Sequence, residues 1–203
     1  EEETIKQKAF NLHSQGNILE AAKYYKYFIN LGFQDQRVFS NYGTILKNQG
    51  KLKEAKLFTN KAIEINPDFA EAHSNLGIVL KDLGNIQDAK SSILKAIELK
   101  PDDADCFFNL SLIELLNGDY QSGLEHYEYR LNKKEPIIFT GTINIQRIDD
   151  KNFEKVKQIL IISEQGLGDT LQYMRYIPYL RELGLDVSFC AEQKLHSLIQ
   201  SSN

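Results

Sequence analysis

From residue 1 to about residue 135, the chain alternates between amphipathic stretches and short polar turns. Apolar residues recur three and four positions apart, which is typical of helices that bury one face. The pattern repeats every 34 residues, and its clearest marker is a glycine column: Gly16, Gly50, Gly84 and Gly118. Glycine suits a tight turn between antiparallel helices because it accepts positive φ without a Cβ clash. The pattern therefore predicts four helix–turn–helix repeats.

Small residues form two more columns in the same register. The first helices carry Ala9, Gly43, Gly77 and Ser111, and the second helices carry Ala21, Ala55, Ala89 and Gly123. Small side chains at facing positions predict a close approach of the two helices. Pro67 and Pro101 are expected to end the second helices of repeats two and three, since proline cannot continue a helix.

The pattern changes after residue 157. Residues 159–162 form a continuous apolar run, which predicts a strand buried on both faces. A glycine-containing turn and a helix from about Thr170 to Leu183 follow, and Pro178 should bend that helix. Residues 186–191 predict a second strand, and residues 192–200 a second helix. Residues 158–203 thus predict the opening βαβα of a Rossmann-like sheet, too short for a complete domain.

The stretch between these two regions, residues 136–157, loses the 34-residue period. It contains one proline, one glycine and mixed charges around two short β-rich segments. We expect a linker there. The predicted fold is therefore mainly α: a solenoid over residues 1–135, a linker, and an incomplete α/β segment over residues 158–203.

Composition and charge exclude several classes of function. Hydrophobic residues make up 42% and charged residues 26%, as in ordinary water-soluble domains. The net charge of -4 and the interspersed lysines and arginines argue against nucleic acid as a partner. No apolar run approaches the roughly 20 residues that span a bilayer. Cys106 and Cys190 have no CxxC or histidine neighbours, so we expect no metal site and two buried thiols in a cytoplasmic protein. Since Glu1 is no natural initiator, we also expect the chain to be a piece of a longer protein.

The glycine, small-residue and proline columns together resemble the tetratricopeptide repeat (TPR) family over four consecutive units. Each repeat of such an array buries its face on its neighbours and leaves an inner surface lined mainly by first helices. The resemblance implies a scaffold that binds a peptide or protein in this groove. Self-association of the array stays open.

One column on the expected inner surface consists of amides: Gln7, Asn41, Asn75 and Asn109. An amide offers two donors and an acceptor, which can pair with an extended peptide backbone whatever its side chains. A similar asparagine ladder lines the repeats of the O-linked N-acetylglucosamine transferases, so the resemblance implies a peptide groove at Asn41, Asn75 and Asn109. The alternative is that these amides bond the backbone of the neighbouring repeat, or water.

The chaperone-binding TPR proteins resemble this chain less well at the same surface. Their clamp of lysine, arginine and asparagine grips a terminal carboxylate. The third repeat here has Glu71 and Asn75 where that clamp needs cations. We therefore expect no binding of an acidic chaperone tail.

The fourth repeat departs from the other three. Glu114 replaces the leucine of Leu12, Leu46 and Leu80, and Arg130 stands where Ala62 and Ala96 stand earlier. A terminal capping repeat with a polar outer face would explain the change. The fourth repeat also resembles the closing repeat of bacterial TPR proteins that continue into a glycosyltransferase-like domain.

The loop after the first predicted strand holds the candidate chemistry of the α/β segment. Gly166, Gly168 and Asp169 open a helix at the carboxyl edge of the strand, where backbone N–H groups hold anions and ligands. The dinucleotide fingerprint GxGxxG is incomplete, because Leu171 stands at its last position. Asp169 can either cap its helix or act as a base on a bound hydroxyl.

The segments 159–162 and 164–172, with Arg175, Tyr176 and Pro178, resemble the start of glycosyltransferase domains that follow bacterial TPR arrays. More distantly they are similar to glycosyltransferase family 9, the heptosyltransferases. The resemblance implies that Asp169 is the general base and that Gln165, Gly166, Gly168 and Thr170 form a phosphate or substrate loop. It is weakest in the linker, where relatives carry a tryptophan and this chain has none.

The same resemblance implies a GT-B architecture, in which a second Rossmann-like domain holds most of the nucleotide-sugar site. We expect no cofactor in these 203 residues, no catalysis by them alone, and a nucleotide-sugar donor for a longer parent. Two functions follow. The array is the recruiting arm of a TPR glycosyltransferase, or it is a binding scaffold with an inactive α/β tail.

Overall fold

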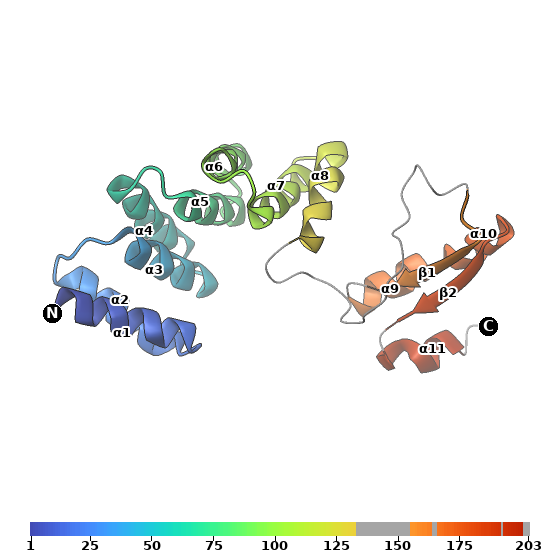
Figure 1. Ribbon diagram of the computed structural model, residues 1–203, viewed down its shortest axis with the longest axis horizontal. Helices are drawn as coiled ribbons and strands as arrows, with labels where there is room; N and C mark the ends of the chain where they lie inside the picture. Colours follow the sequence, from blue (N-terminus) through green and yellow to red (C-terminus); the bar gives the residue numbers. More distant parts are fainter. Residues whose placement is uncertain (133–154, 164–165, 192, 201–203) are drawn as a thin grey trace. The chain divides into compact units, whose positions relative to one another are not determined.

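The computed structural model describes residues 1–132, 155–163, 166–191 and 193–200, and within these it describes no side chains for residues 167–169, 198 and 200. The chain divides into two compact units, Glu1–Pro136 and Ile137–Asn203. Figure 1 labels the elements of both. The predicted linker, residues 136–157, lies outside the described residues except for its last three.

The first unit is a series of antiparallel helix pairs. Its first helices are α1 (Glu2–Ser14), α3 (Gln36–Asn48), α5 (Ala70–Asp82) and α7 (Ala104–Leu116). Its second helices are α2 (Ile18–Asn30), α4 (Leu52–Ile65), α6 (Ile86–Leu99) and α8 (Tyr120–Tyr127), with α8 continued by the 3₁₀ turn η1 (Glu128–Leu131). Corresponding first helices begin 34 residues apart, so the helical solenoid predicted from the glycine columns is confirmed.

The turn glycines have the predicted backbone. Gly16, Gly50, Gly84 and Gly118 lie at φ between 75° and 83°, a region that side chains with a Cβ rarely adopt. Each turn also closes a backbone bond from the residue after the glycine to the first helix, as in Asn85 N–H to Leu80 O at 2.9 Å. These bonds satisfy carbonyl groups that the helix end would leave unpaired.

The small-residue columns allow the two helices of a repeat to touch through their backbones. A Cβ placed on Gly77 would lie 2.6 Å from Ile93 Cδ1 and 3.1 Å from the Ala89 carbonyl oxygen. Gly43 is equally tight, because a Cβ there would lie 2.6 Å from Thr59 Oγ1. The predicted close approach is therefore confirmed at these two repeats.

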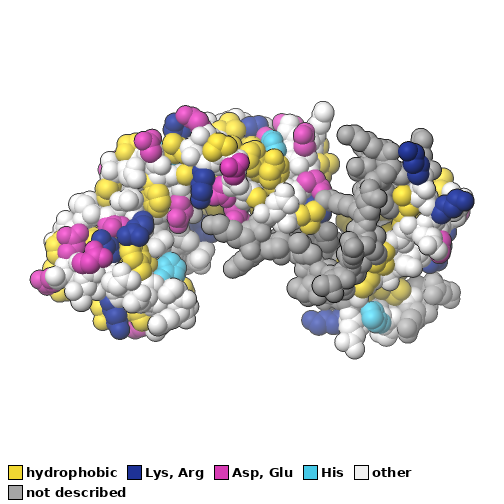
Figure 2. Space-filling model, viewed as in Figure 1, with side chains coloured by type: hydrophobic (Ala, Val, Ile, Leu, Met, Phe, Trp, Pro, Cys, Tyr) yellow, Lys and Arg dark blue, Asp and Glu magenta, His cyan; other side chains and the backbone are white. Residues whose placement is uncertain are grey.

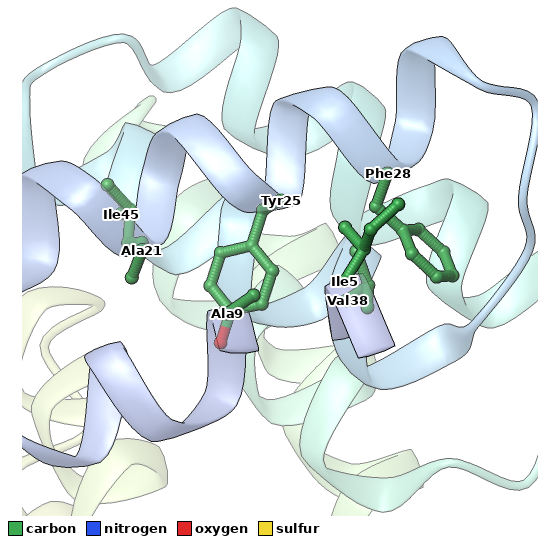
Figure 3. Close-up of a cluster of buried hydrophobic side chains, with 7 residues drawn as sticks. All are labelled: Ile5, Ala9, Ala21, Tyr25, Phe28, Val38 and Ile45. Atoms are coloured by element: carbon green, nitrogen blue, oxygen red, sulfur yellow. The ribbon is translucent and has the colours of Figure 1, made fainter. Parts of the chain in front are cut away.

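Stacking of successive repeats completes the core. The cluster in Figure 3 brings together Ile5 and Ala9 of α1, Ala21, Tyr25 and Phe28 of α2, and Val38 and Ile45 of α3. All seven are at most 9% exposed. The first repeat thus buries its apolar residues partly against the first helix of the second repeat, as a solenoid requires.

One side of the array is formed by the first helices. α3 lies against α5 and α5 against α7, whereas successive second helices within the described array hardly touch one another. We call this side, formed by α1, α3, α5 and α7, the first-helix side. It corresponds to the inner surface expected from the sequence.

The second unit contains a two-stranded parallel sheet. Strand β1 (Gln158–Ile162) pairs with β2 (Asp186–Cys190), with Gln158 opposite Asp186 and Ile162 opposite Cys190. Ile159, Ile177 and Val187 form its small core. Full burial of β1 on both faces was wrong for the described structure, because Ile159 is the single buried residue of that strand and its neighbours are partly exposed. Two parallel strands do not by themselves establish a Rossmann-like domain.

The connection between the strands differs from the single bent helix that we predicted. It consists of α9 (Leu167–Met174) and α10 (Ile177–Glu182), separated at Arg175 and Tyr176. Pro178 lies in the first turn of α10, where its missing N–H costs nothing, so it accompanies a new helix start. After β2, η3 (Gln193–Leu195) and α11 (His196–Gln200) occupy the predicted second helix.

Candidate functional site

The asparagine column lies on the first-helix side. Asn41 is on α3, Asn75 on α5 and Asn109 on α7, and all three side chains are partly exposed. Gln7, the first member, is exposed on α1 and bonds Asn11 of its own helix. The structure thus places one amide per repeat on one side of the array. The three asparagines share a further property, a bond to a hydroxyl of the preceding repeat.

The Asn41 amide is held by a buried tyrosine. Asn41 Nδ2 donates to the Tyr25 hydroxyl at 3.2 Å, and His13 Nδ1 lies 3.0 Å from the same oxygen. Tyr25 is fully buried, and this burial raises the pKa of its hydroxyl, although the bond from Asn41 opposes the shift and Asp35 adds to it. The phenol therefore stays neutral and offers a fixed anchor for the amide.

The next two asparagines are held by serines. Asn75 Nδ2 donates to Ser40 Oγ at 2.9 Å, and Asn109 Nδ2 makes a longer contact of 3.5 Å with Ser74 Oγ. Ser40 is fully buried, which is costly for a hydroxyl without a partner. The amides thus bond the neighbouring repeat. The sequence had suggested its backbone as the alternative partner, but the structure shows side-chain hydroxyls in that role.

Sequence reasoning missed these hydroxyls. Ser40 and Ser74 stand 34 residues apart, one position before Asn41 and Asn75. That recurrence was visible in the sequence. Their pairing with the following repeat was not, because it depends on how the repeats stack.

Lys6 occupies the serine position in the first repeat. It pairs with Glu3 at 2.7 Å and with Asp35 at 3.2 Å. These acidic partners, Glu3 first, raise the pKa of the Lys6 ammonium group against a smaller opposing effect of burial. Asp35 also caps α3 by accepting from the backbone N–H of Arg37 and Val38. Lys6 therefore links repeat one to the start of repeat two through its ion pair with Asp35. The hydroxyl that holds Asn41 comes instead from Tyr25.

The fourth repeat replaces an apolar contact by a charged cluster. Glu114, which is 3% exposed, pairs with Lys90 Nζ at 3.1 Å and with His126 Nδ1 at 2.7 Å. Glu114, which interrupts the leucine column, is thus paired with one side chain from the third repeat and one from the fourth. The repeat also exposes Leu116, Tyr120 and Leu124 to at least 60%, so its surface is not uniformly polar. The interpretation as a terminal cap stays a prediction.

The loop residues of the second unit lie only partly within the described structure. Gln165 lies outside it, and Asp169 is described only as a position in the first turn of α9. Gly166 precedes α9, and Thr170 is buried, with Oγ1 2.7 Å from Ser163 Oγ and 3.2 Å from the Gly166 carbonyl oxygen. The Thr170 hydroxyl therefore ties the end of β1 to the start of α9. The roles assigned to Asp169, Gln165, Gly166, Gly168 and Thr170 stay predictions.

The remaining candidate groups add no chemistry among the described residues. Cys106 is buried and its pKa is raised chiefly by burial, whereas Cys190 is partly exposed, which corrects the prediction of two buried thiols. No group of three metal-ligating side chains occurs within the described parts of the chain. Over the same residues, no helix combines the length and apolarity that crossing a bilayer requires. Figure 2 shows acidic and basic side chains interspersed over the visible face of the repeats.

Family models identify the class of the repeats. A TPR repeat model matches residues 43–84, and a tetratricopeptide repeat model matches residues 70–103. Helix pairs with the same glycine turns extend over residues 2–131, although the last helix, α8, is shorter than the others. Residues 43–103 are therefore tetratricopeptide repeats, and the helix pairs on either side share their helix–turn–helix fold.

Solved structures share this fold. The TPR protein YrrB, described as having an unusual peptide-binding site, is 21% identical with a TM-score of 0.56, over 63% of this chain and 66% of YrrB. A MamA fragment from Desulfovibrio magneticus RS-1, residue 41 to the end, is 17% identical with a TM-score of 0.58, over 66% of this chain and 78% of the fragment. The first TPR of Spaghetti (RPAP3), bound to the HSP90 peptide SRMEEVD, is 20% identical with a TM-score of 0.54, over 58% and 93%. Identities this low show the fold alone. No curated protein matches the chain.

Proposed function

We propose that the first-helix side binds an extended peptide segment of another protein through Asn41, Asn75 and Asn109. The supporting observation is the repeated amide, partly exposed and bonded at one N–H, in three successive repeats. Each amide has a second N–H and an oxygen, which complement the carbonyl and N–H of a peptide group. YrrB, which has an unusual peptide-binding site, and the first TPR of Spaghetti, which binds an HSP90 peptide, lend the proposal general support.

Selection from a random peptide library tests this proposal on the full chain. Twelve-residue peptides displayed on phage are selected against the 203-residue protein, and a selected peptide is resynthesised with single backbone N–H groups replaced by ester oxygens. Because the amides pair with backbone groups, ester replacement at the contacted positions should weaken binding about three- to tenfold each. If side-chain changes alone alter the affinity, backbone recognition is excluded.

The acidic peptide SRMEEVD serves as a second probe. Glu71 lies on α5 close to Asn75, where a carboxylate-gripping clamp would need a cation. We expect no measurable binding of SRMEEVD by calorimetry. Micromolar binding would assign this surface to chaperone tails.

A second proposal concerns a longer parent of this chain, which would transfer a sugar from a nucleotide donor while the repeats recruit the acceptor. The parallel pairing of β1 and β2 through α9 and α10, with a glycine loop before α9, supports it. Asp169 would then accept the proton of the acceptor hydroxyl. In the parent protein, Asp169→Asn should lower turnover at least 100-fold at unchanged stability. Unchanged turnover would remove Asp169 from the mechanism.

A further inference from the structure

We infer that Tyr25, Ser40 and Ser74 are positioning residues, each of which orients one asparagine of the next repeat for the ligand. We call the oriented residues, Asn41, Asn75 and Asn109, the ladder asparagines. The inference rests on the proposed peptide binding and extends it. It assigns a role to residues that touch no peptide themselves.

The first argument is the pairing across repeats. Each hydroxyl belongs to one repeat and each asparagine to the next: Tyr25 with Asn41, Ser40 with Asn75, and Ser74 with Asn109. The bonds join residues 16 or 35 positions apart in sequence, so they are not local helix contacts. A ladder asparagine is therefore oriented only when the preceding repeat is folded against it.

The second argument is the substitution pattern within the chain. Serine occupies the position before the amide in repeats two and three, and each serine accepts from the asparagine one repeat further on, Ser40 from Asn75 and Ser74 from Asn109. Lys6 occupies it in repeat one and pairs with acids, and there Tyr25 supplies the hydroxyl from the second helix. The positions matching Tyr25 in the next repeats are Thr59, which bonds its own helix, and Ile93. The chain thus provides one hydroxyl for each ladder asparagine from whichever helix can reach it.

The third argument is burial. Tyr25 and Ser40 are fully buried. A buried polar group destabilises the fold unless it makes a hydrogen bond. An alanine would fit the Ser40 site with no such cost. One N–H of Asn41 and one of Asn75 are committed to these hydroxyls, so each planar amide presents its oxygen and its second N–H in a fixed direction. The contact of Asn109 with Ser74 is longer, at 3.5 Å. Fixing a side chain before binding removes an entropy loss from the binding step.

The test uses a peptide selected on the full wild-type chain and measures its affinity by calorimetry for four variants. Ser40→Ala should weaken binding about three- to tenfold, since one orienting bond is lost. Asn75→Ala should weaken it at least as much. In the Asn75→Ala background, Ser40→Ala should have no further effect, because there is no amide left to orient.

Ser111→Ala is the matched control. Ser111 is also a fully buried serine of a first helix, but its hydroxyl bonds the Phe108 carbonyl of its own helix at 2.7 Å. We expect unchanged affinity. Thermal unfolding of each variant establishes that the fold is kept.

The outcomes separate the two claims. If no peptide is selected, or Asn75→Ala binds normally, the proposed function fails. If Asn75→Ala weakens binding but Ser40→Ala does not, or if the two losses add, the positioning role is wrong while peptide binding stands.

Discussion

Burial sets the protonation behaviour of the tyrosine that anchors the ladder. The pKa of Tyr25 is raised in the folded chain, mainly because burial disfavours the phenolate. As pH rises, the unfolded chain loses this proton first, so unfolding becomes more favourable. The stabilising contribution is complete below about pH 10 and is lost as pH rises through the folded-state pKa.

We therefore predict that the free energy of unfolding falls above about pH 10, and that Tyr25→Phe makes this fall shallower. Urea unfolding between pH 8 and pH 11 measures it. Tyr27→Phe is the control, since Tyr27 lies on the same helix and is 49% exposed. Equal slopes for both variants would show that Tyr25 does not carry the effect.

Gly77 determines how closely α5 and α6 approach. A Cβ there would meet the Ile93 side chain and the Ala89 carbonyl oxygen, and the backbone oxygen cannot move aside without shifting α6. Gly77→Val should lower the free energy of unfolding by about 1–3 kcal/mol, the usual cost of overpacking. Ser91→Val introduces the same side chain on the exposed face of α6, where it meets no such contact, and should cost less than about 0.5 kcal/mol. Similar losses for both would mean that the approach is not tight.

At the scale of elements, the junction of α6, α7 and α8 depends on Glu114. Its carboxylate is buried, whereas Lys90 and His126 keep 31% and 27% side-chain exposure, so solvent screens part of the interaction. Glu114→Ala removes the shared partner and leaves a gap in the position that leucine fills in earlier repeats. Because Lys90 and His126 keep some access to water, we expect a loss of about 1–3 kcal/mol.

Glu114→Leu is the informative comparison for this junction. Replacing a buried ion pair by an apolar residue of similar volume is often neutral or stabilising. We therefore expect a clearly smaller loss than for alanine, or a gain, in the same urea measurement. If leucine is as harmful as alanine, the charged pairs themselves stabilise the fourth repeat.

At the scale of the whole molecule, the helix pairs were predictable and the pairing of their side chains was not. The turn at Gly84 and the packing at Gly77 follow from local steric requirements, which a single sequence displays directly. The bond from Asn75 to Ser40 needs two repeats in their stacked positions. In the second unit, the break at Arg175 was missed because the bend had been assigned to Pro178, which instead lies in the first turn of α10.

The array is also a one-dimensional assembly, in which each helix pair packs on its neighbours. The spacing of Asn41, Asn75 and Asn109 is therefore set by repeat stacking and not by any loop. A ligand that spans several repeats would reinforce contacts between them. Binding of a selected peptide should accordingly raise the midpoint of thermal unfolding, by a stabilisation that grows with the logarithm of the peptide concentration once that concentration exceeds Kd.

The claim that this side binds peptides through its asparagines is tested most directly by the affinity of a selected peptide for Asn75→Ala/Asn109→Ala. The control is Asn30→Ala, at the exposed end of α2. We predict that the double variant binds at least tenfold more weakly than the wild-type chain while remaining folded at the temperature of the assay, and that the control binds normally. Wild-type affinity in the double variant would contradict the account.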